Sequence, residues 1–384
     1  MSSESIASHP DRLLPADPAT RSIARSLLAD VEHLPIVSPH GHVPPAMIAE
    51  DTPFPDPADL FISPDHCLTR LLHANGEDLA DLRVGGRTET DPRESWRIFC
   101  RHWKDFDGTA TGYWLGSSFV NVFGIEDSKI DEAGDGLSGY AGYLRAMQNR
   151  RRYFIDHGAV SPDHGTHDAL TLKLAEAEAD RLLAKGLAGE FTAEEAHAFE
   201  ANMTYQFARM AVEDGLVMTL HPSVHRNHSP ETFEKFGADT GHDIPFRMEY
   251  TRSLQPLLAD FGNAKGFNLV LFTIDETVFS REIAPLAGFY PSVYVGAPWW
   301  FIDEPDAMHY WRSAITGTAG FTRSSGFIDD ARAFTSIPAR HEASRRTGAS
   351  FLAKLVAEHR ITEDRVHGII VGVADAAPRR AFKL

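Results

Sequence analysis

Short apolar runs alternate with helical stretches through most of this chain. Two of the helical stretches are expected at 248–261 and 307–316. Runs that are apolar almost throughout and separated by helices are typical of parallel strands buried on both faces. The pattern therefore predicts an α/β fold with a parallel sheet covered by helices. The runs lie at 34–42, 215–221, 267–275, 292–300 and 326–330.

The apolar runs, and one more strand-to-loop transition near residue 163, end on polar or catalytically able residues. Barrels and open α/β sheets both carry their sites at the carboxyl ends of their strands. Six such ends favour a barrel over an open, doubly wound sheet. We therefore predict a distorted (β/α)8 barrel of the TIM type in a single domain, residues 1–384, with a mostly helical insertion at 46–120. The ends are His40 and His42, Asp163 and His164, His221, Asp275, Trp299 and Trp300, and Asp329 and Asp330.

Composition excludes several classes of protein. The 384 residues carry a formal net charge of −17, which repels nucleic acid and anionic membranes. No run approaches the ~20 apolar residues of a membrane span, and the first residues lack a signal-peptide pattern. We therefore expect a cytoplasmic protein that binds neither nucleic acid nor membrane. Two cysteines supply neither a disulfide framework nor a four-thiolate zinc site.

A His-Gly-His sequence follows the first apolar run. Residues i and i+2 of a strand point to the same side, so His40 and His42 could bind one metal ion, for which imidazole is a suitable ligand. Two histidines in a surface loop are the alternative. Asp330 could complete this mononuclear site or act as a general base, and Arg332 could bind a carboxylate through two N–H groups. A surface Asp–Arg turn is the alternative for this pair.

Other polar and aromatic residues could border a substrate pocket. His164 could bind or polarise a substrate oxygen, with a structural role as the alternative. His221 opens a stretch with three histidines and Arg226 that is too polar for a core. Trp299 and Trp300 could form a wall against a sugar ring or pack over the barrel mouth. The sequence has no motif of a serine hydrolase, a P-loop or a dinucleotide-binding strand.

Together these motifs resemble the uronate (glucuronate) isomerase family of the amidohydrolase superfamily. They are spread over most of the chain and occur in the family's order. Their combination is specific, although no single motif is. They are Ser-Pro-His-Gly-His at 38–42, Pro-Asp-His at 64–66, Ser-Pro-Asp-His-Gly at 161–165, Trp-Trp-Phe at 299–301, Asp-Ala-Arg at 330–332, Arg-His-Glu at 340–342 and Arg-Arg at 345–346.

The resemblance implies an aldose–ketose isomerase that interconverts D-glucuronate with D-fructuronate, and D-galacturonate with D-tagaturonate, through a cis-enediol. It implies one divalent metal ion, zinc first and manganese or iron as alternatives, bound by His40, His42 and Asp330. Asp330 and His66 are the implied catalytic residues, and Arg332 the residue that binds the substrate carboxylate. The hexuronate is the expected partner, and a homo-oligomer is left open. Further residues expected at the substrate are His164, His221, Trp299, Trp300 and Cys67.

The sequence departs from the family pattern in two places. Cys67 stands where the family usually has a tyrosine that moves a proton between O1 and O2, and a thiol is a weaker hydrogen-bond donor. The second departure is that six strand ends are visible where a closed barrel needs eight. An open barrel exposes strand edges, so we expect an internal segment near residues 125–136 to be missing from this sequence. An intact mass close to 42.5 kDa would contradict this.

Two alternative functions remain open from the sequence. A metal-dependent hydrolase on the same scaffold fits His164 and His221, although Arg332 and the Trp-Trp-Phe motif favour the isomerase. A sugar-acid binding protein that has lost catalysis fits Cys67 and the short middle of the chain. Affinity for a uronate without turnover would reveal that second alternative.

Overall fold

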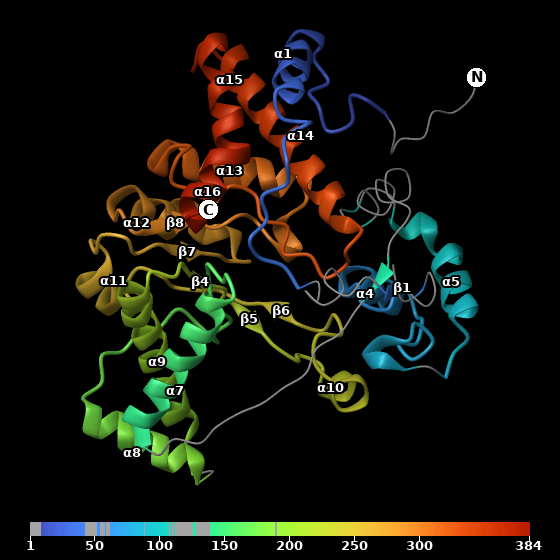
Figure 1. Cartoon of the computed structure of the whole chain (residues 1–384). Coiled ribbons are helices and arrows are strands. Elements are labelled where there is room, and N and C mark those ends of the chain that lie inside the picture. The colour runs from blue at the N-terminus through green and yellow to red at the C-terminus, as the bar shows by residue number, and fades with distance from the viewer. Residues whose placement is uncertain are drawn as a thin grey trace.

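The fold centres on a small parallel sheet surrounded by helices (Figure 1). The structure is a computed structural model of the chain. The described residues are 9–42, 52–53, 58, 62–87, 89–106, 109, 111, 126–127, 139–188 and 190–384.

Four strands form the central sheet in the order β3-β4-β7-β8, and all neighbours are parallel. The register pairs Thr219 with Val270 and Val270 with Tyr294. A further parallel bridge joins Val295 to Ser324. The parallel sheet predicted from the apolar runs is therefore confirmed. The strands are β3 (Asp163–His164), β4 (Met218–Leu220), β7 (Leu269–Leu271) and β8 (Val293–Val295).

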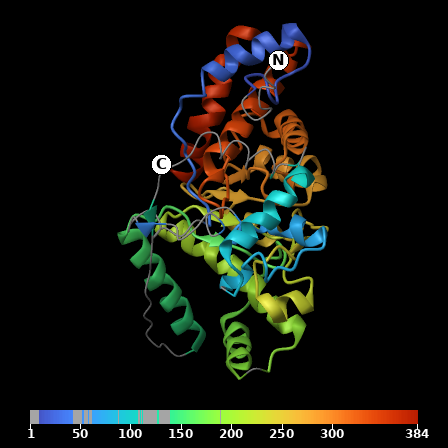
Figure 2. The same ribbon diagram turned by 90° about the vertical axis from the view of Figure 1, so that its right-hand side faces the viewer.

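Helices pack on the sheet because the strands are apolar on both faces. Leu269 and Leu271 of β7 share one buried cluster with Trp311 and Ile315, which lie on α13 (Pro305–Ala319). Figures 1 and 2 show α8 and α9 at the end of the molecule opposite α1. The other helices of this part of the fold are α7 (Gly139–Asp156), α8 (Glu176–Leu187), α9 (Ala193–Asp214), α11 (Gln255–Phe261), α12 (Ala284–Phe289) and α14 (Ser336–Ala357). Of these, α8 packs on α7 and α9.

The helix at 193–214 begins where its capping sequence predicts. The hydroxyl of Thr192 accepts from the N–H of Glu195, and the Glu195 side chain accepts from the N–H of Thr192, which completes a capping box. The helix expected at 307–316 also forms, as α13. The one expected at 248–261 is shorter, because 251–254 form a turn before α11.

Two of the apolar runs are not regular strands. The run at 34–42 contains Pro35 and Pro39, which have no N–H to donate to a ladder, and it joins the last run through one hydrogen bond from His42 N to Ala331 O (2.8 Å). In the run at 326–330, Gly326 and Asp330 have positive φ angles (69° and 45°), which interrupt an extended ladder. These predictions of strands were wrong, although the first and last runs do lie side by side.

A smaller helical part covers one side of the sheet's carboxyl edge (Figure 1). Its own apolar cluster includes Leu68, Leu72 and Phe99. It belongs to the insertion predicted at 46–120, of which a large share lies outside the described residues. Its elements are β1 (Thr52–Pro53), which pairs with β2 (Glu126–Asp127), α4 (His66–Ala74), η2 (Val84–Gly86), α5 (Pro92–Arg101) and η3 (Trp103–Phe106).

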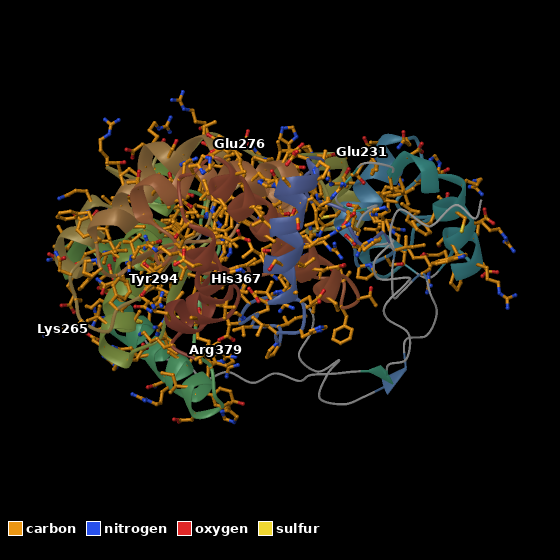
Figure 3. All side chains as sticks on the ribbon, turned by 90° about the horizontal axis from the view of Figure 1, so that it is seen from above. Glu231, Lys265, Glu276, Tyr294, His367 and Arg379 are labelled. Atoms are coloured by element: carbon orange, nitrogen blue, oxygen red, sulfur yellow. The ribbon has the colours of Figure 1, made fainter. Side chains whose placement is uncertain are left out.

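The first helix of the described chain packs against the C-terminal helices above the sheet (Figure 1). Helix α1 (Pro18–Ala29) lies beside the C-terminal helices (Figure 3), and His367 of α15 (Glu363–Val371) contacts Asp30 at 2.5 Å. The described helices include none with the length and apolarity that crossing a membrane requires. The remaining elements are β5 (Val224–His225), which pairs with β6 (Ile244–Pro245), α10 (Pro230–Phe236), η4 (Glu276–Val278), η5 (Phe279–Ile283), η6 (Trp300–Ile302), η7 (Gly372–Ala376) and α16 (Ala377–Phe382).

The sheet has one edge strand in the described part of the chain. There, β3 pairs with β4 and with no second neighbour. A closed barrel would need strands between the first run and β3, which is the region where the sequence pattern also lacks them. Closure of the barrel stays a prediction.

Candidate metal and substrate site

The candidate site lies at the carboxyl end of the parallel strands, as the strand-end pattern predicts. His221 follows β4, and Asp163 is in β3. Trp299 follows β8, and Asp330 follows the segment that bridges to β8 at Ser324. His40 and His42 reach the same place because His42 hydrogen-bonds to Ala331.

Four side chains converge at this edge, namely His40, His42, His221 and Asp330. The Nε2 atoms of His40 and His42 lie 2.9 and 3.0 Å from Oδ1 of Asp330. Ligand atoms of His40, His221 and Asp330 all lie within 4.8 Å of one another, a group that could hold a metal ion. The sequence thus predicted the HxH–Asp group, whereas it placed His221 with the substrate. The structure places His221 beside His40, with the two rings stacked at 5.0 Å.

The hydrogen-bond partners of this group leave lone pairs free for a metal ion. Nδ1 of His221 lies 2.5 Å from Oδ1 of Asp163, so the N–H of this ring points to the carboxylate and Nε2 carries a lone pair. That Nε2 is buried without a hydrogen-bond partner. Nε2 of His40 and Oδ1 of Asp330 lie close to each other, but their contact does not have hydrogen-bond geometry, so both atoms are buried without a hydrogen bond as well. Buried polar atoms rarely stay unpaired, and a carboxylate behind a ligand histidine is the usual second layer of a metal site. The residues present therefore fit a metal ion.

Asp330 is held in an unusual backbone conformation. Its φ of 45° lies in the left-handed region, which is uncommon for residues other than glycine and is found most often at functional sites. Burial alone raises the pKa of Asp330, but His40 and His42 outweigh burial and hold the pKa well below its usual range. Asp330 is therefore a carboxylate at neutral pH, as a metal ligand must be.

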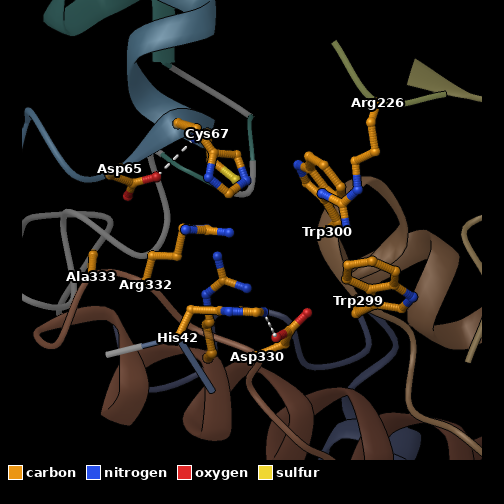
Figure 4. Close-up of a pocket in the computed structure, with 11 residues that line it drawn as sticks. His42, Asp65, Cys67, Arg226, Trp299, Trp300, Asp330, Arg332 and Ala333 are labelled. Atoms are coloured by element: carbon orange, nitrogen blue, oxygen red, sulfur yellow. Dashed lines mark hydrogen bonds and ion pairs between the residues drawn. The ribbon is translucent and has the colours of Figure 1, made fainter. Parts of the chain in front are cut away.

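A pocket opens beside the converging side chains, with about 470 Å³ of empty space that is partly open to solvent (Figure 4). It combines the metal group with aromatic, basic and thiol groups. Three of its residues come from the start of α4, where Asp65 accepts from the N–H of Cys67 (2.9 Å) and caps the helix. The lining residues are His42, Asp65, His66, Cys67, Arg226, Trp299, Trp300, Asp330, Arg332, Ala333 and Arg340.

His66 and Cys67 are both uncharged in this pocket. Burial and the guanidinium groups of Arg332 and Arg340 lower the pKa of His66 to about 3, so its imidazole is neutral at pH 7. Its Nδ1 is buried without a hydrogen-bond partner. Burial and the neighbouring carboxylate of Asp65 raise the pKa of Cys67 to about 12. The thiol at the position of the family tyrosine therefore stays protonated.

Another part of the pocket lining is basic and aromatic, and Trp300 lies against His66 of α4 at 5.0 Å. Arg226 lies over the ring of Trp300 at 5.6 Å, and Trp299 stands edge-on to His221 at 4.9 Å. Arg332 forms an ion pair with Asp239 (3.0 Å). The side chains of Arg332 and Asp239 are 27% and 47% exposed, so an incoming anion could exchange with this contact. Trp299, Trp300 and Arg332 thus lie where the sequence predicts, and Arg226 is an addition to the predicted substrate residues.

A buried ion pair holds the backbone next to Asp330 in place. Arg340 donates to Oδ2 of Asp303 (2.7 Å) and to the carbonyl of Asp329 (3.0 Å). His341 donates to Oδ2 of Asp329 (3.0 Å). Arg340 and His341 belong to the Arg-His-Glu motif, but no role was predicted for either of them. Their contacts fix the backbone just before Asp330.

The structure does not support His164 as a substrate residue. Consecutive strand residues point to opposite faces, and because Asp163 faces His221, the next side chain turns away from the pocket. The ring of His164 packs on Phe207 at 4.7 Å, and its Nδ1 bonds to the carbonyl of Thr219 (2.9 Å). The alternative structural role stated above is the one that the contacts favour.

His164 predicts a pH dependence of stability. Burial lowers the pKa of folded His164 to about 4, so between about pH 6.5 and 4 the unfolded chain takes up a proton that the folded chain does not. The free energy of unfolding should therefore fall as the pH decreases through this window. We expect a loss of about 2 kcal/mol, less than the full shift implies because the ring is only partly buried. Urea unfolding at several pH values measures it.

The control is a second histidine variant. His164→Gln should reduce the slope of this part of the pH profile, while the slope due to His66, whose folded pKa is about 3, should remain. His33→Gln should not, because the His33 side chain is 88% exposed. Equal slopes for wild type and His164→Gln would show that His164 is not the titrating group.

Known proteins match this chain over nearly its whole length. A family model described as glucuronate isomerase matches residues 18–136 and 128–373. A uronate isomerase from Corynebacterium efficiens is 53% identical over 100% of both chains. The chain belongs to the glucuronate isomerase family. The glucuronate isomerase structure from Caulobacter crescentus, 38% identical, has a TM-score of 0.94 over 98% of this chain and 97% of that one.

More distant members of the glucuronate isomerase family share the fold. The uronate isomerase structure from Thermotoga maritima is 22% identical and has a TM-score of 0.86 over 98% of this chain and 99% of that one. This likeness concerns the fold alone. It agrees with the mixed α/β architecture and the parallel sheet described above.

This member of the glucuronate isomerase family lacks internal residues that the Corynebacterium protein has. The alignment with the Corynebacterium protein spans 468 positions, 84 more than the 384 residues of this chain. The family model matches as two pieces that meet at 128–136. This is the region where the sequence pattern lacks two strands, and it lies largely outside the described residues. That the natural chain carries a further segment here stays a prediction.

Proposed function

We propose that this protein interconverts a hexuronic acid aldose and its ketose, the activity for which its family is named. The observation that carries the proposal is the pocket itself, which joins a group able to hold a metal ion to the cation Arg332 and to the aromatic pair Trp299 and Trp300. These groups suit a hexuronate. Arg332 can pair with its carboxylate, the metal ion can bind its oxygens, and the tryptophan rings can pack against its carbon chain. The proposed substrates are D-glucuronate and D-galacturonate.

The proposed cofactor is one divalent metal ion, with zinc favoured over manganese or iron. His40, His42 and Asp330 are the proposed ligands, with His221 as a fourth group within reach. Imidazole and carboxylate donors are typical of catalytic zinc, which also keeps a position free for substrate. When bound, such an ion supplies positive charge that polarises substrate oxygens.

The proposed place of the substrate carboxylate is next to Arg332. A guanidinium group can hold a carboxylate through two parallel hydrogen bonds. Arg226 adds positive charge on the same side, although Asp243 already pairs with it at 2.8 Å. In a protein of net charge −17, this local positive charge is what lets an anionic sugar enter.

Asp330 and His66 are the proposed proton-transfer groups. One oxygen of Asp330 faces His42, and the other points toward Trp299 and the open space (Figure 4). In the isomerisation this second oxygen takes the proton from C2 and returns it to C1, through a cis-enediol. The neutral imidazole of His66 has one donor and one acceptor nitrogen, so it can pass a proton between O2 and O1. Cys67, a protonated thiol, can only donate a weak hydrogen bond there.

A coupled assay for ketose formation tests the function. We expect turnover of D-glucuronate or D-galacturonate, loss of turnover after a chelator, and recovery on adding zinc or manganese. Arg332→Lys should raise KM by about tenfold or more with unchanged metal content, because a point charge replaces the paired donors. Arg252→Lys is the matched control, because the Arg252 side chain is 91% exposed and borders a different part of the surface.

Two outcomes would contradict the proposal. Uronate binding without turnover by the metal-loaded protein would favour the binding-protein alternative. Turnover that survives complete removal of metal would refute the metal assignment. The intact mass is measured on the same sample, because a mass close to 42.5 kDa would show that the natural chain carries no further segment.

A further inference from the structure

A second buried arginine, Arg312, forms no ion pair with any carboxylate of the described residues. Arg312 lies on α13, and 7% of its surface is exposed. It packs on the ring of Trp311 at 4.2 Å, and its Nη1 is 3.5 Å from the hydroxyl of Ser324. Within the described residues no ion pair involves Arg312, whereas the equally buried Arg340 pairs with Asp303. Arg312 is thus a buried cation without a partner of opposite charge.

Such a group is unusual on physical grounds. A buried charge is costly unless it is paired, and buried charges are normally paired or bound to an ion. Burial lowers the pKa of Arg312 to about 9, which still leaves its guanidinium group charged at neutral pH. The described side chains that contact this charge, the Trp311 ring and the Ser324 hydroxyl, carry no negative charge of their own.

Two small adjoining pockets, both partly open to solvent, border this arginine. Arg312, Phe327, Ser344 and Gly348 border both pockets. Arg345 borders the larger one, and its N–H groups bond to backbone carbonyls, such as that of Leu34 at 2.8 Å. Neither lining includes an aspartate or glutamate. In a chain with 54 acidic residues, a space whose lining includes two arginines and no carboxylate favours an anion over a cation.

A glycine keeps this space open. Gly348 lies inside α14, where glycine destabilises a helix by about 0.5–1 kcal/mol relative to alanine. A Cβ built at Gly348 would meet nothing within 4 Å, so packing does not require a glycine here. Its lack of a side chain leaves room beside Arg312 and the hydroxyl of Ser344.

We propose that the space between α13 and α14 binds a small tetrahedral oxyanion of the phosphate or sulfate class. Arg312 donates to two of its oxygens, and Ser344 donates to a third. Arg345 adds charge from the other side. None of these residues lines the pocket that contains Asp330 and Arg332, so this site is separate from the proposed catalytic one.

Thermal unfolding of the metal-loaded protein tests this site, with sodium phosphate or sulfate against sodium chloride at equal ionic strength. We expect the oxyanion to raise the melting temperature of the wild type by about 2 °C or more at saturation. Arg312→Met should abolish the rise. Without oxyanion, Arg312→Met should melt no lower than the wild type, because an apolar side chain of similar length replaces an unpaired buried charge.

Three further variants separate the possible causes. Gly348→Leu fills the space while keeping Arg312, and it should also abolish the rise. Arg332→Gln should keep the rise, because it alters only the catalytic pocket. Arg360→Gln, at a side chain that is 60% exposed, should keep it as well. A rise that persists in Arg312→Met, one that disappears in Arg332→Gln, or no rise in the wild type would each overturn the proposal.

Discussion

Asp330→Asn should reduce kcat/KM for the hexuronate by about 10³-fold or more, because one carboxylate has two proposed roles. Its Oδ1 faces both His40 and His42, and the amide of asparagine cannot supply the same negative charge to a metal ion. The same change removes the proposed acceptor of the C2 proton. Metal content, measured by elemental analysis, should fall together with turnover.

Asp275→Asn is the matched control for this prediction. Asp275 also follows an apolar strand, β7, but its carboxylate accepts from the N–H groups of Thr277 and Met248 and lies outside the pocket lining. Its activity should stay close to that of the wild type. Near-normal turnover in Asp330→Asn would remove Asp330 from both roles.

Arg340→Met should lower the free energy of unfolding by about 3–5 kcal/mol, because it leaves the buried Asp303 without a partner. Asp303 is 1% exposed, and Arg340 5%. The carbonyl of Asp329 loses a donor in the same change. Equilibrium unfolding in urea, with metal held constant, measures the loss.

A double variant shows whether the unpaired carboxylate is the cause. Asp303→Asn combined with Arg340→Met removes both charges, so it should recover a large part of the loss. Arg97→Met breaks an exposed contact with Glu94 and should change stability by less than about 1 kcal/mol. If the double variant is no more stable than Arg340→Met, the buried charge does not explain the effect.

The sequence predicted the parallel sheet and its functional edge because both depend on local patterns. Apolar runs mark buried strands, and polar residues at their ends mark the edge where the strands finish. Thus His40, His42 and Asp330 could be grouped before their distances were known. The orientation of His164 could also have been predicted, since Asp163 and His164 are consecutive and their side chains point to opposite faces of the strand.

Contacts between distant segments were not predictable in this way. The pairing of His221 with Asp163 depends on the register of β3 against β4, and a shift of one residue would turn either side chain away. The Arg340–Asp303 pair joins a helix to a loop after β8, with no periodicity to reveal it. The strands expected at 34–42 and 326–330 failed because prolines and positive φ angles interrupted an otherwise suitable apolar pattern.

The proposed ligands come from opposite ends of the chain, which has a consequence for biosynthesis. His40 and His42 leave the ribosome early, whereas Asp330 emerges only when little of the chain remains to be made. A nascent chain can therefore present two imidazoles, but it cannot form the complete group. Acquisition of the metal ion should be an event that follows translation, and a prematurely terminated product should not retain it.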